Sequence, residues 1–167
     1  FYLFFITVRD FFKKKFNNVS QNIAHFGFSL LILSILFNNL LSTEIITNLK
    51  VGETYDDSKT KIVFESIDQE NQKNYKAIIA NFSILNSNGA NDNLSPELRV
   101  YNQPKITTSE ADIQTTLMKD KFIVINLVQN QDYFNVRYQV KPFMLWIWFS
   151  VILISFGGVM SFLKKRL

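Results

Sequence analysis

The chain has 167 residues, of which 47% are hydrophobic and 15% aromatic, and its formal net charge is +4. It contains no cysteine and one histidine, which excludes disulfide frameworks, Cys/His zinc sites, thiol nucleophiles and catalytic triads, and no glycine-rich phosphate loop is present. No catalytic residue is therefore assigned, and any redox chemistry requires a cofactor or residues from outside this chain.

Residues 1–20 form a basic segment, which carries Arg9 and three consecutive lysines and begins like the tail of an earlier apolar helix. Residues 21–42 follow as a predicted transmembrane helix. Its apolar run extends from Ile23 to Leu41, about the 20 residues that cross a bilayer core as a helix.

His25 lies inside this apolar run, two residues before Gly27. An imidazole in hydrocarbon needs a hydrogen-bond partner or a metal, because unpaired polar atoms are costly there. The residues alone leave two interpretations of His25 open, a functional ligand and a structural histidine bonded to a neighbouring helix. Gly27 likewise either permits close helix packing or lets a cofactor approach.

Residues 43–141 predict a β-rich extramembrane domain, a sandwich or partly closed barrel. Alternating apolar residues indicate strands in "TKIVFESI" and "AIIANFSIL", the second followed by the turn "NSNG". "KFIVINLV" and "YFNVRYQV" indicate a hairpin around "QNQD". "TTSEADIQTTL" predicts a short helix with its N-cap at Thr108 or Ser109.

The core of this domain is predicted from the residues that share the inward face of each strand. They are Phe64, Ile78, Phe82, Ile84, Ile123, Ile125, Phe134 and Val136. The carboxylates of the domain are scattered among lysines, which predicts a solvated surface.

Residues 142–163 carry no charge and are predicted to form a second transmembrane helix. Residues 164–167 form a basic tail. Trp146 and Trp148, at its start, are typical of the aromatic belt at a membrane interface. By the positive-inside rule the two basic ends lie on one side of the membrane and the β domain on the other. The basic charge is therefore a topology signal, and a nucleic-acid partner is not expected.

The order of several short motifs resembles the CcmF family, the haem lyase component of cytochrome c maturation. The matching stretches are "AHFG" at Ala24–Gly27, "VGETY" at Val51–Tyr55, "SPELRVY", "TTSEADIQTTLMKDKFIVI" and "KPFMLWIW", in the family's order over about residues 9–166. The family's tryptophan-rich external motif and three of its four important histidines are absent. The chain thus resembles the C-terminal part of the family, as a fragment or a split protein.

The resemblance implies a component of the enzyme that joins haem covalently to apocytochrome c, although whether this chain is itself an enzyme stays open. It implies that His25 is an axial ligand to the iron of a b-type haem, with Gly27 beside it. The implied partners are membrane lipid, other haem lyase subunits or the N-terminal part of the same protein, the haem chaperone and apocytochrome c. Arg99 and Tyr101 either pack on their own sheet or belong to a docking surface for these partners.

Heavy use of Phe, Ile, Asn and Lys is typical of AT-rich organellar genomes. It favours the mitochondrial inner membrane, with the β domain in the intermembrane space, and the bacterial inner membrane is the alternative. The alternative function is a non-catalytic membrane anchor or assembly subunit with an external β domain.

Overall fold

The computed structural model describes residues 2–12, 19–86, 89, 91–128 and 132–166. The chain divides into two compact units. A helical unit contains residues 1–42, 116–120 and 141–167, and a β unit contains residues 43–115 and 121–140. The central residues of the turns "NSNG" and "QNQD" lie outside the described residues.

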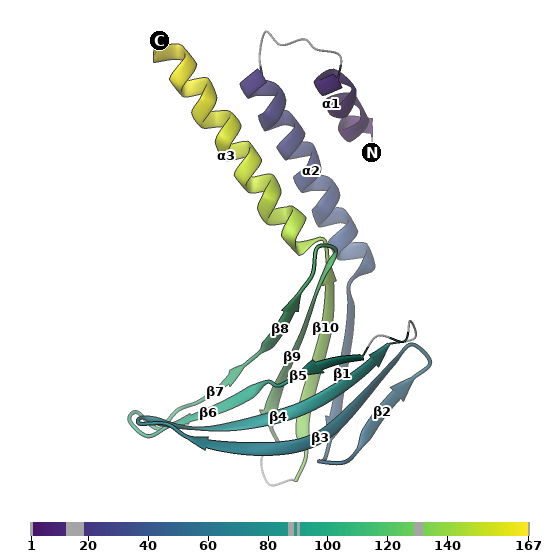
Figure 1. The fold of residues 1–167 in the computed structure, drawn as a ribbon, viewed down its shortest axis with the longest axis vertical. Coiled ribbons are helices and arrows are strands. Elements are labelled where there is room, and N and C mark those ends of the chain that lie inside the picture. The colour runs from purple at the N-terminus through teal and green to yellow at the C-terminus, as the bar shows by residue number, and fades with distance from the viewer. Residues whose placement is uncertain (1, 13–18, 87–88, 90, 129–131, 167) are drawn as a thin grey trace. The chain divides into compact units, whose positions relative to one another are not determined.

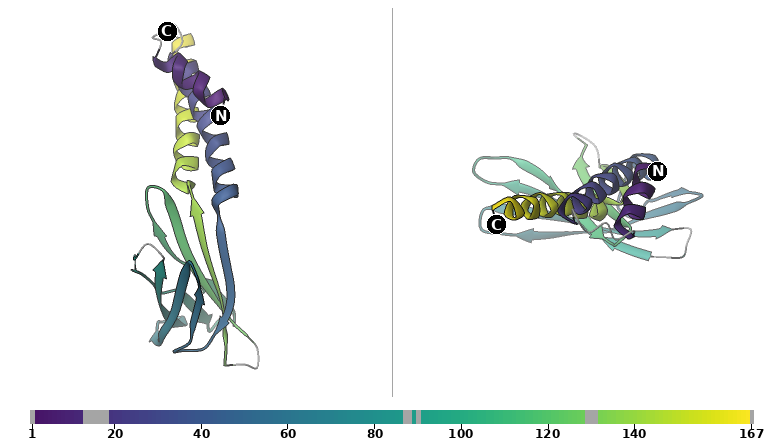
Figure 2. Two further views of the ribbon diagram at one scale, coloured as in Figure 1. Left: turned by 90° about the vertical axis from the view of Figure 1, so that its right-hand side faces the viewer. Right: turned by 90° about the horizontal axis from the view of Figure 1, so that it is seen from above.

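The helical unit consists of α1 (Tyr2–Phe12), α2 (Val19–Leu41) and α3 (Met144–Arg166). Among the described residues, α2 and the Met144–Lys164 part of α3 are helices long and apolar enough to cross a membrane. The two lie side by side, and α1 lies along α2 (Figures 1 and 2). The predicted fold class, two apolar helices flanking a β-rich domain, is confirmed.

The β unit contains ten strands among the described residues, arranged as two sheets (Figure 1). One sheet has the order β1-β10-β9-β8, and the other has the order β2-β3-β4-β6-β7, with β5 also paired to β4. The strands are β1 (Thr43–Leu49), β2 (Thr54–Asp57), β3 (Thr60–Asn71), β4 (Tyr75–Asn86), β5 (Asn91–Leu94), β6 (Glu97–Tyr101), β7 (Thr107–Glu110), β8 (Asp112–Thr115), β9 (Lys119–Leu127) and β10 (Phe134–Pro142).

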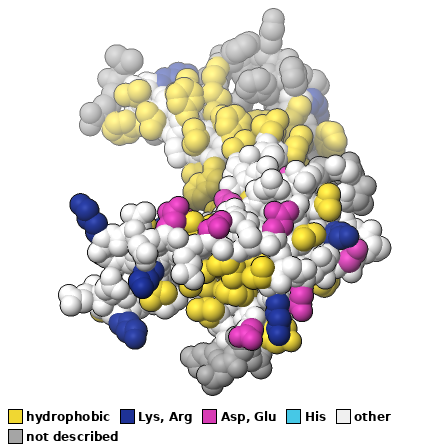
Figure 3. All heavy atoms as spheres, turned by 60° about the horizontal axis from the view of Figure 1, so that its bottom comes forward, with side chains coloured by type: hydrophobic (Ala, Val, Ile, Leu, Met, Phe, Trp, Pro, Cys, Tyr) yellow, Lys and Arg dark blue, Asp and Glu magenta, His cyan; other side chains and the backbone are white. Residues whose placement is uncertain are grey.

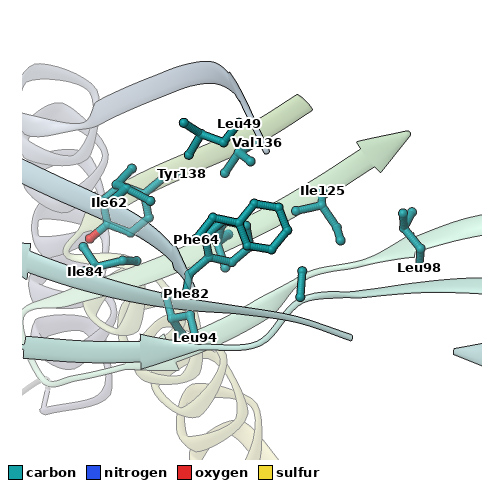
Figure 4. Close-up of a cluster of buried hydrophobic side chains, with 12 residues drawn as sticks. Leu49, Ile62, Phe64, Phe82, Ile84, Leu94, Leu98, Ile125, Val136 and Tyr138 are labelled. Atoms are coloured by element: carbon teal, nitrogen blue, oxygen red, sulfur yellow. The ribbon is translucent and has the colours of Figure 1, made fainter. Parts of the chain in front are cut away.

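The two sheets share one hydrophobic core, to which both contribute alternate residues (Figure 4). Phe64 of β3 and Phe82 of β4 stack with their ring centroids 4.4 Å apart, and Phe134 of β10 meets Phe64 edge-on. Of the eight predicted core residues, six are buried, while Ile78 and Phe134 are partly buried against the same cluster. The predicted core is therefore confirmed.

A β-bulge in β3 keeps this core continuous. The register of β3 on β4 shifts between Phe64 and Ser66, so Ile67 pairs with Ala80 although it lies three residues after Phe64. An extra residue in one strand restores the inward direction of the next apolar side chain. Ile67 accordingly packs against the core.

Gly52 makes the turn from the first sheet to the second. Its φ of 84° lies in the left-handed region, where glycine carries no steric penalty. The Gly52 amide donates to the carbonyl of Phe64 at 2.7 Å, and the Glu53 amide donates to that of Lys50 at 3.0 Å. The glycine of the "VGETY" motif is thus required by this turn.

The predicted short helix over "TTSEADIQTTL" is wrong. The segment forms β7, which pairs with β6 from Val100↔Thr107 to Glu97↔Glu110, and then β8 in the other sheet. Its threonines are β-branched and favour strands, and pairing with β6 outweighs the local resemblance to a helix cap. The segment therefore carries the chain from one sheet to the other.

The prediction that the carboxylates are solvated is wrong for Asp92 of β5. Asp92 and Lys121 are 8% and 4% exposed and form an ion pair between strands of the two sheets. The Asn86 side chain donates a further hydrogen bond to the same carboxylate oxygen at 2.9 Å. A buried charge requires such a partner, because desolvation of a lone carboxylate is costly.

Tyr138 lies beside this pair, and its hydroxyl is buried without a hydrogen-bond partner among the described residues. Burial, together with the negative charge of Asp92, raises the pKa of Tyr138 to about 12 from an ordinary value of 10.0. The folded state therefore holds this proton at pH values where the unfolded chain has released it.

This pKa predicts that the β unit loses stability as the pH rises from about 10 toward 12. Unfolding releases the Tyr138 proton in that window, so alkali favours the unfolded state. We expect Tyr138→Phe to lose less stability over the same window, because it has no proton to release. Thermal melts of both proteins at pH 8 and across this window measure the difference, and parallel pH profiles would contradict the prediction.

Candidate functional site

His25 lies on the exposed side of α2, where it lines a cavity of about 220 Å³. Phe28 of α2 and Leu3 and Thr7 of α1 complete the lining. Residues three or four positions apart are neighbours on one face of a helix. His25 and Phe28 are three apart on α2, and Leu3 and Thr7 are four apart on α1. The cavity is thus built by two facing helix surfaces and is predominantly apolar.

The imidazole of His25 makes no hydrogen bond to any residue that the structure describes. No group of three or more His, Cys, Asp or Glu side chains suited to a metal ion occurs in the described part of the chain either. The site therefore offers one nitrogen ligand in apolar surroundings. This donor set fits a group that is itself largely apolar and takes a single axial ligand from each side, as haem iron does.

Thr7 connects α1 to α2 next to this cavity. Its hydroxyl lies 2.9 Å from that of Ser29, and either hydroxyl can donate in this hydrogen bond. Ser29 is 2% exposed, and whichever hydroxyl accepts donates its own proton within its helix, Thr7 to the carbonyl of Phe4 or Ser29 to that of Phe26. Thr7, Leu3 and Phe28 could not be assigned to the site from the sequence, since the helical spacing within each segment is the one signal that they carry.

Gly27 faces α3, where it allows the two long helices to approach closely. A Cβ at Gly27 would lie 3.0 Å from the backbone nitrogen of Ile154 and from the Cβ of Leu153. One at Gly157 of α3 would lie 2.7 Å from the carbonyl oxygen of Ser20 and 2.8 Å from the nitrogen of Ala24. These contacts agree with the packing interpretation of Gly27, and its contact with a cofactor stays a prediction.

We expect Gly157→Ala to destabilise the pair of long helices by about 1–3 kcal/mol, the usual cost of overpacking. The atoms that the new methyl group would meet are backbone atoms of α2, which cannot rotate away. Gly158→Ala is the matched control, because a Cβ there meets no atom within 4 Å among the described residues. Thermal unfolding of both variants in detergent measures the effect, and equal melting temperatures would contradict it.

Arg99 and Tyr101 pack on their own sheet, as one of the two interpretations predicts. The Arg99 guanidinium lies 5.3 Å from the centre of the Tyr75 ring, and its Nε donates to Glu97 at 2.9 Å. The Tyr75 and Tyr101 ring centroids are 5.2 Å apart. The Glu97 carboxylate also raises the pKa of Arg99. Figure 3 shows acidic, basic and hydrophobic side chains interspersed on the visible face of the β unit.

The structure thus defines a β-sandwich joined at both ends to helices long and apolar enough to cross a membrane, and an apolar cavity in the helical unit that is lined by a histidine. A family model described as the CcmF C-terminal beta-sandwich matches residues 40–142. The chain belongs to this family.

Most of the chain aligns in sequence with known proteins. It is 26% identical over 163 residues, 98% of its length, to the cytochrome c-type biogenesis protein CcmF of Haemophilus influenzae, of which it covers 25%. It is 29% identical over 143 residues, 86% of its length, to the cytochrome c-type biogenesis protein ccl1 of Rhodobacter capsulatus, of which it covers 22%. The chain therefore spans about a quarter of the length of these relatives.

Part of a solved structure, the cytochrome c heme lyase CcmF, has the same fold. It superposes with a TM-score of 0.63 at 17% identity, and the match covers 84% of this chain and 24% of that one.

Proposed function

We propose that this chain is the C-terminal part of a membrane haem lyase, which attaches haem covalently to apocytochrome c. Membership of the CcmF C-terminal beta-sandwich family and the names of the relatives support this role. Because the chain corresponds to about a quarter of those relatives, other subunits or an N-terminal part supply the remaining machinery. The haem chaperone and apocytochrome c are the further partners of this proposal.

The observation that carries the proposal is the imidazole of His25, which has no hydrogen-bond partner among the described residues and lines an apolar cavity. An unpaired imidazole is unfavourable in a membrane-spanning helix unless another group binds it. We assign His25 as an axial ligand of a b-type haem, whose chemistry when bound is to pass electrons. His25 is the one residue of this cavity that would hold the iron, so a further ligand would have to come from outside the cavity lining.

The remaining residues of the site position the ligand. The bond between Thr7 and Ser29 holds α1 beside the cavity, and Phe28 and Leu3 offer apolar surface to a porphyrin. Gly157 of α3 packs against Ala24 of α2, the residue before His25. This close contact fixes which side of α2 faces α3. The imidazole is thereby presented on the side of α2 that meets α1.

We place the chain in an energy-transducing membrane, with the β unit outside. The relatives described above are bacterial, and the composition favours the mitochondrial inner membrane, with the β unit in the intermembrane space. The lysines and arginines at both ends of the chain support an inner location for both termini.

This orientation predicts that protease added to the outer side cuts within residues 43–141 and leaves both termini protected. The exposed turn around Ser58 is a suitable place for an engineered cleavage site. Mass spectrometry of the fragments identifies the accessible side, and cleavage of that site from the inner side alone would contradict the orientation.

The experiment that tests the function is a reduced-minus-oxidised absorbance spectrum of the complex purified through this chain from its native membrane. We expect the absorbance bands of a b-type haem. A complex that assembles with its partners but shows no such haem would overturn the proposal and favour the alternative, a non-catalytic anchor or assembly subunit.

A further inference from the structure

The turn between β8 and β9 exposes two consecutive apolar side chains. Leu117 and Met118 are 61% and 56% exposed. Residues at the tip of a β-hairpin are usually polar or glycine, because they meet water. An apolar pair at this position therefore indicates that the tip contacts something other than water.

Hydrogen bonds hold this turn against the start of α3, within the helical unit. Trp146 Nε1 donates to the carbonyl of Leu117 at 3.0 Å, and the Phe143 amide donates to that of Met118 at 2.8 Å. The turn itself is closed by the Thr116 hydroxyl, which donates to the carbonyl of Lys119 at 2.7 Å. The apolar pair is thus fixed beside the first turn of α3.

The C-terminal end of α2 lies beside the start of α3, at the same level as this turn. Asn38 Nδ2 donates to the carbonyl of Pro142 at 2.6 Å, and the rings of Phe37 and Phe143 are 5.3 Å apart. If α2 and α3 span the bilayer, as proposed above, this level is the place where both helices leave the hydrocarbon. An indole such as that of Trp146 is favoured at this depth.

We propose that Leu117 and Met118 insert into the lipid interface and form a third membrane contact of this chain. The start of α3 exposes further apolar side chains, Leu145, Trp148 and Phe149. Lys119 and Lys141 flank the two segments, where their ammonium groups reach the lipid headgroups. This contact fixes the depth at which α3 enters the bilayer.

Single-cysteine labelling tests this proposal, because the chain has no cysteine of its own. The full-length protein is prepared in nanodiscs as Leu117→Cys or Met118→Cys and labelled with an environment-sensitive fluorophore. Lipids with a nitroxide near the headgroup then quench labels in the interface, lipids with a nitroxide deep in the acyl chain quench labels in the hydrocarbon, and aqueous iodide quenches labels in water. Ile152→Cys, on the exposed side of α3, and Ser58→Cys, in an exposed turn of the β unit, are the controls.

We expect the labels at positions 117 and 118 to be quenched by the headgroup nitroxide lipid at least threefold more than the label at position 58. Iodide quenching equal to that at position 58 would overturn the proposal, and so would protection from every quencher, which indicates a protein partner. Quenching at position 152 by the acyl-chain nitroxide reports the membrane span separately. Its loss would refute the proposed span, whereas its presence without quenching at 117 and 118 would refute only the interfacial turn.

Discussion

Replacing His25 by alanine is expected to remove the b-type haem from the assembled complex while leaving both long helices inserted. His25 supplies the sole imidazole of this chain, so no other histidine in it can replace the ligand. Insertion is preserved because alanine is more favourable than histidine in hydrocarbon and the span keeps its length. Cytochrome c maturation should fall with the haem content.

Haem content per complex, measured by absorbance after reduction, tests this prediction. His25→Gln can replace a hydrogen bond but is a poor iron ligand, so it should also lose the haem. Ile35→Ala, an exposed position of α2 outside the cavity lining, is the control and should keep it. Normal haem content in both His25 variants would leave this residue as an ordinary packing histidine.

Phe64→Ala should destabilise the β unit by about 3–5 kcal/mol, as expected for removal of a buried phenylalanine. Phe64 is fully buried, and its ring contacts Phe82 from the same sheet and Phe134 from the opposite sheet. Its truncation therefore opens a cavity at the centre of the sandwich (Figure 4).

Chemical denaturation of the full-length protein, followed by circular dichroism of the β unit, measures this loss. Ile46→Ala is the control, because Ile46 is 61% exposed on β1 and its change should stay within about 0.5 kcal/mol. Equal free energies of unfolding for the two variants would show that Phe64 does not hold the core.

The strands that form the core could be predicted because their apolar residues alternate over long runs. In β4, Ile78, Ala80, Phe82 and Ile84 face one side, and the structure places all four in or against the core. The segment of β7 and β8 could not be assigned correctly, since hydroxyl and acidic residues favour a helix cap and a strand edge alike. Its structure depends on pairing with the preceding strand β6, and the residues of the segment do not themselves reveal that pairing.

The ion pair of Asp92 and Lys121 could not be predicted for a similar reason. The residues are 29 positions apart, on strands of different sheets, and nothing in either local sequence distinguishes them from surface charges. His25 stands out in the sequence because an imidazole is unusual in an apolar run. The residues around it were not, because they come from the contact between α1 and α2.

Chemical rescue tests the central claim most directly. The His25→Gly complex, purified from its native membrane, is titrated with free imidazole while its haem absorbance spectrum is recorded. We predict a weakened or absent b-type spectrum without imidazole, and its return as imidazole enters the cavity beside Phe28 and binds the iron. An unaltered b-type spectrum in His25→Gly before any imidazole is added would contradict the assignment of His25 as the ligand.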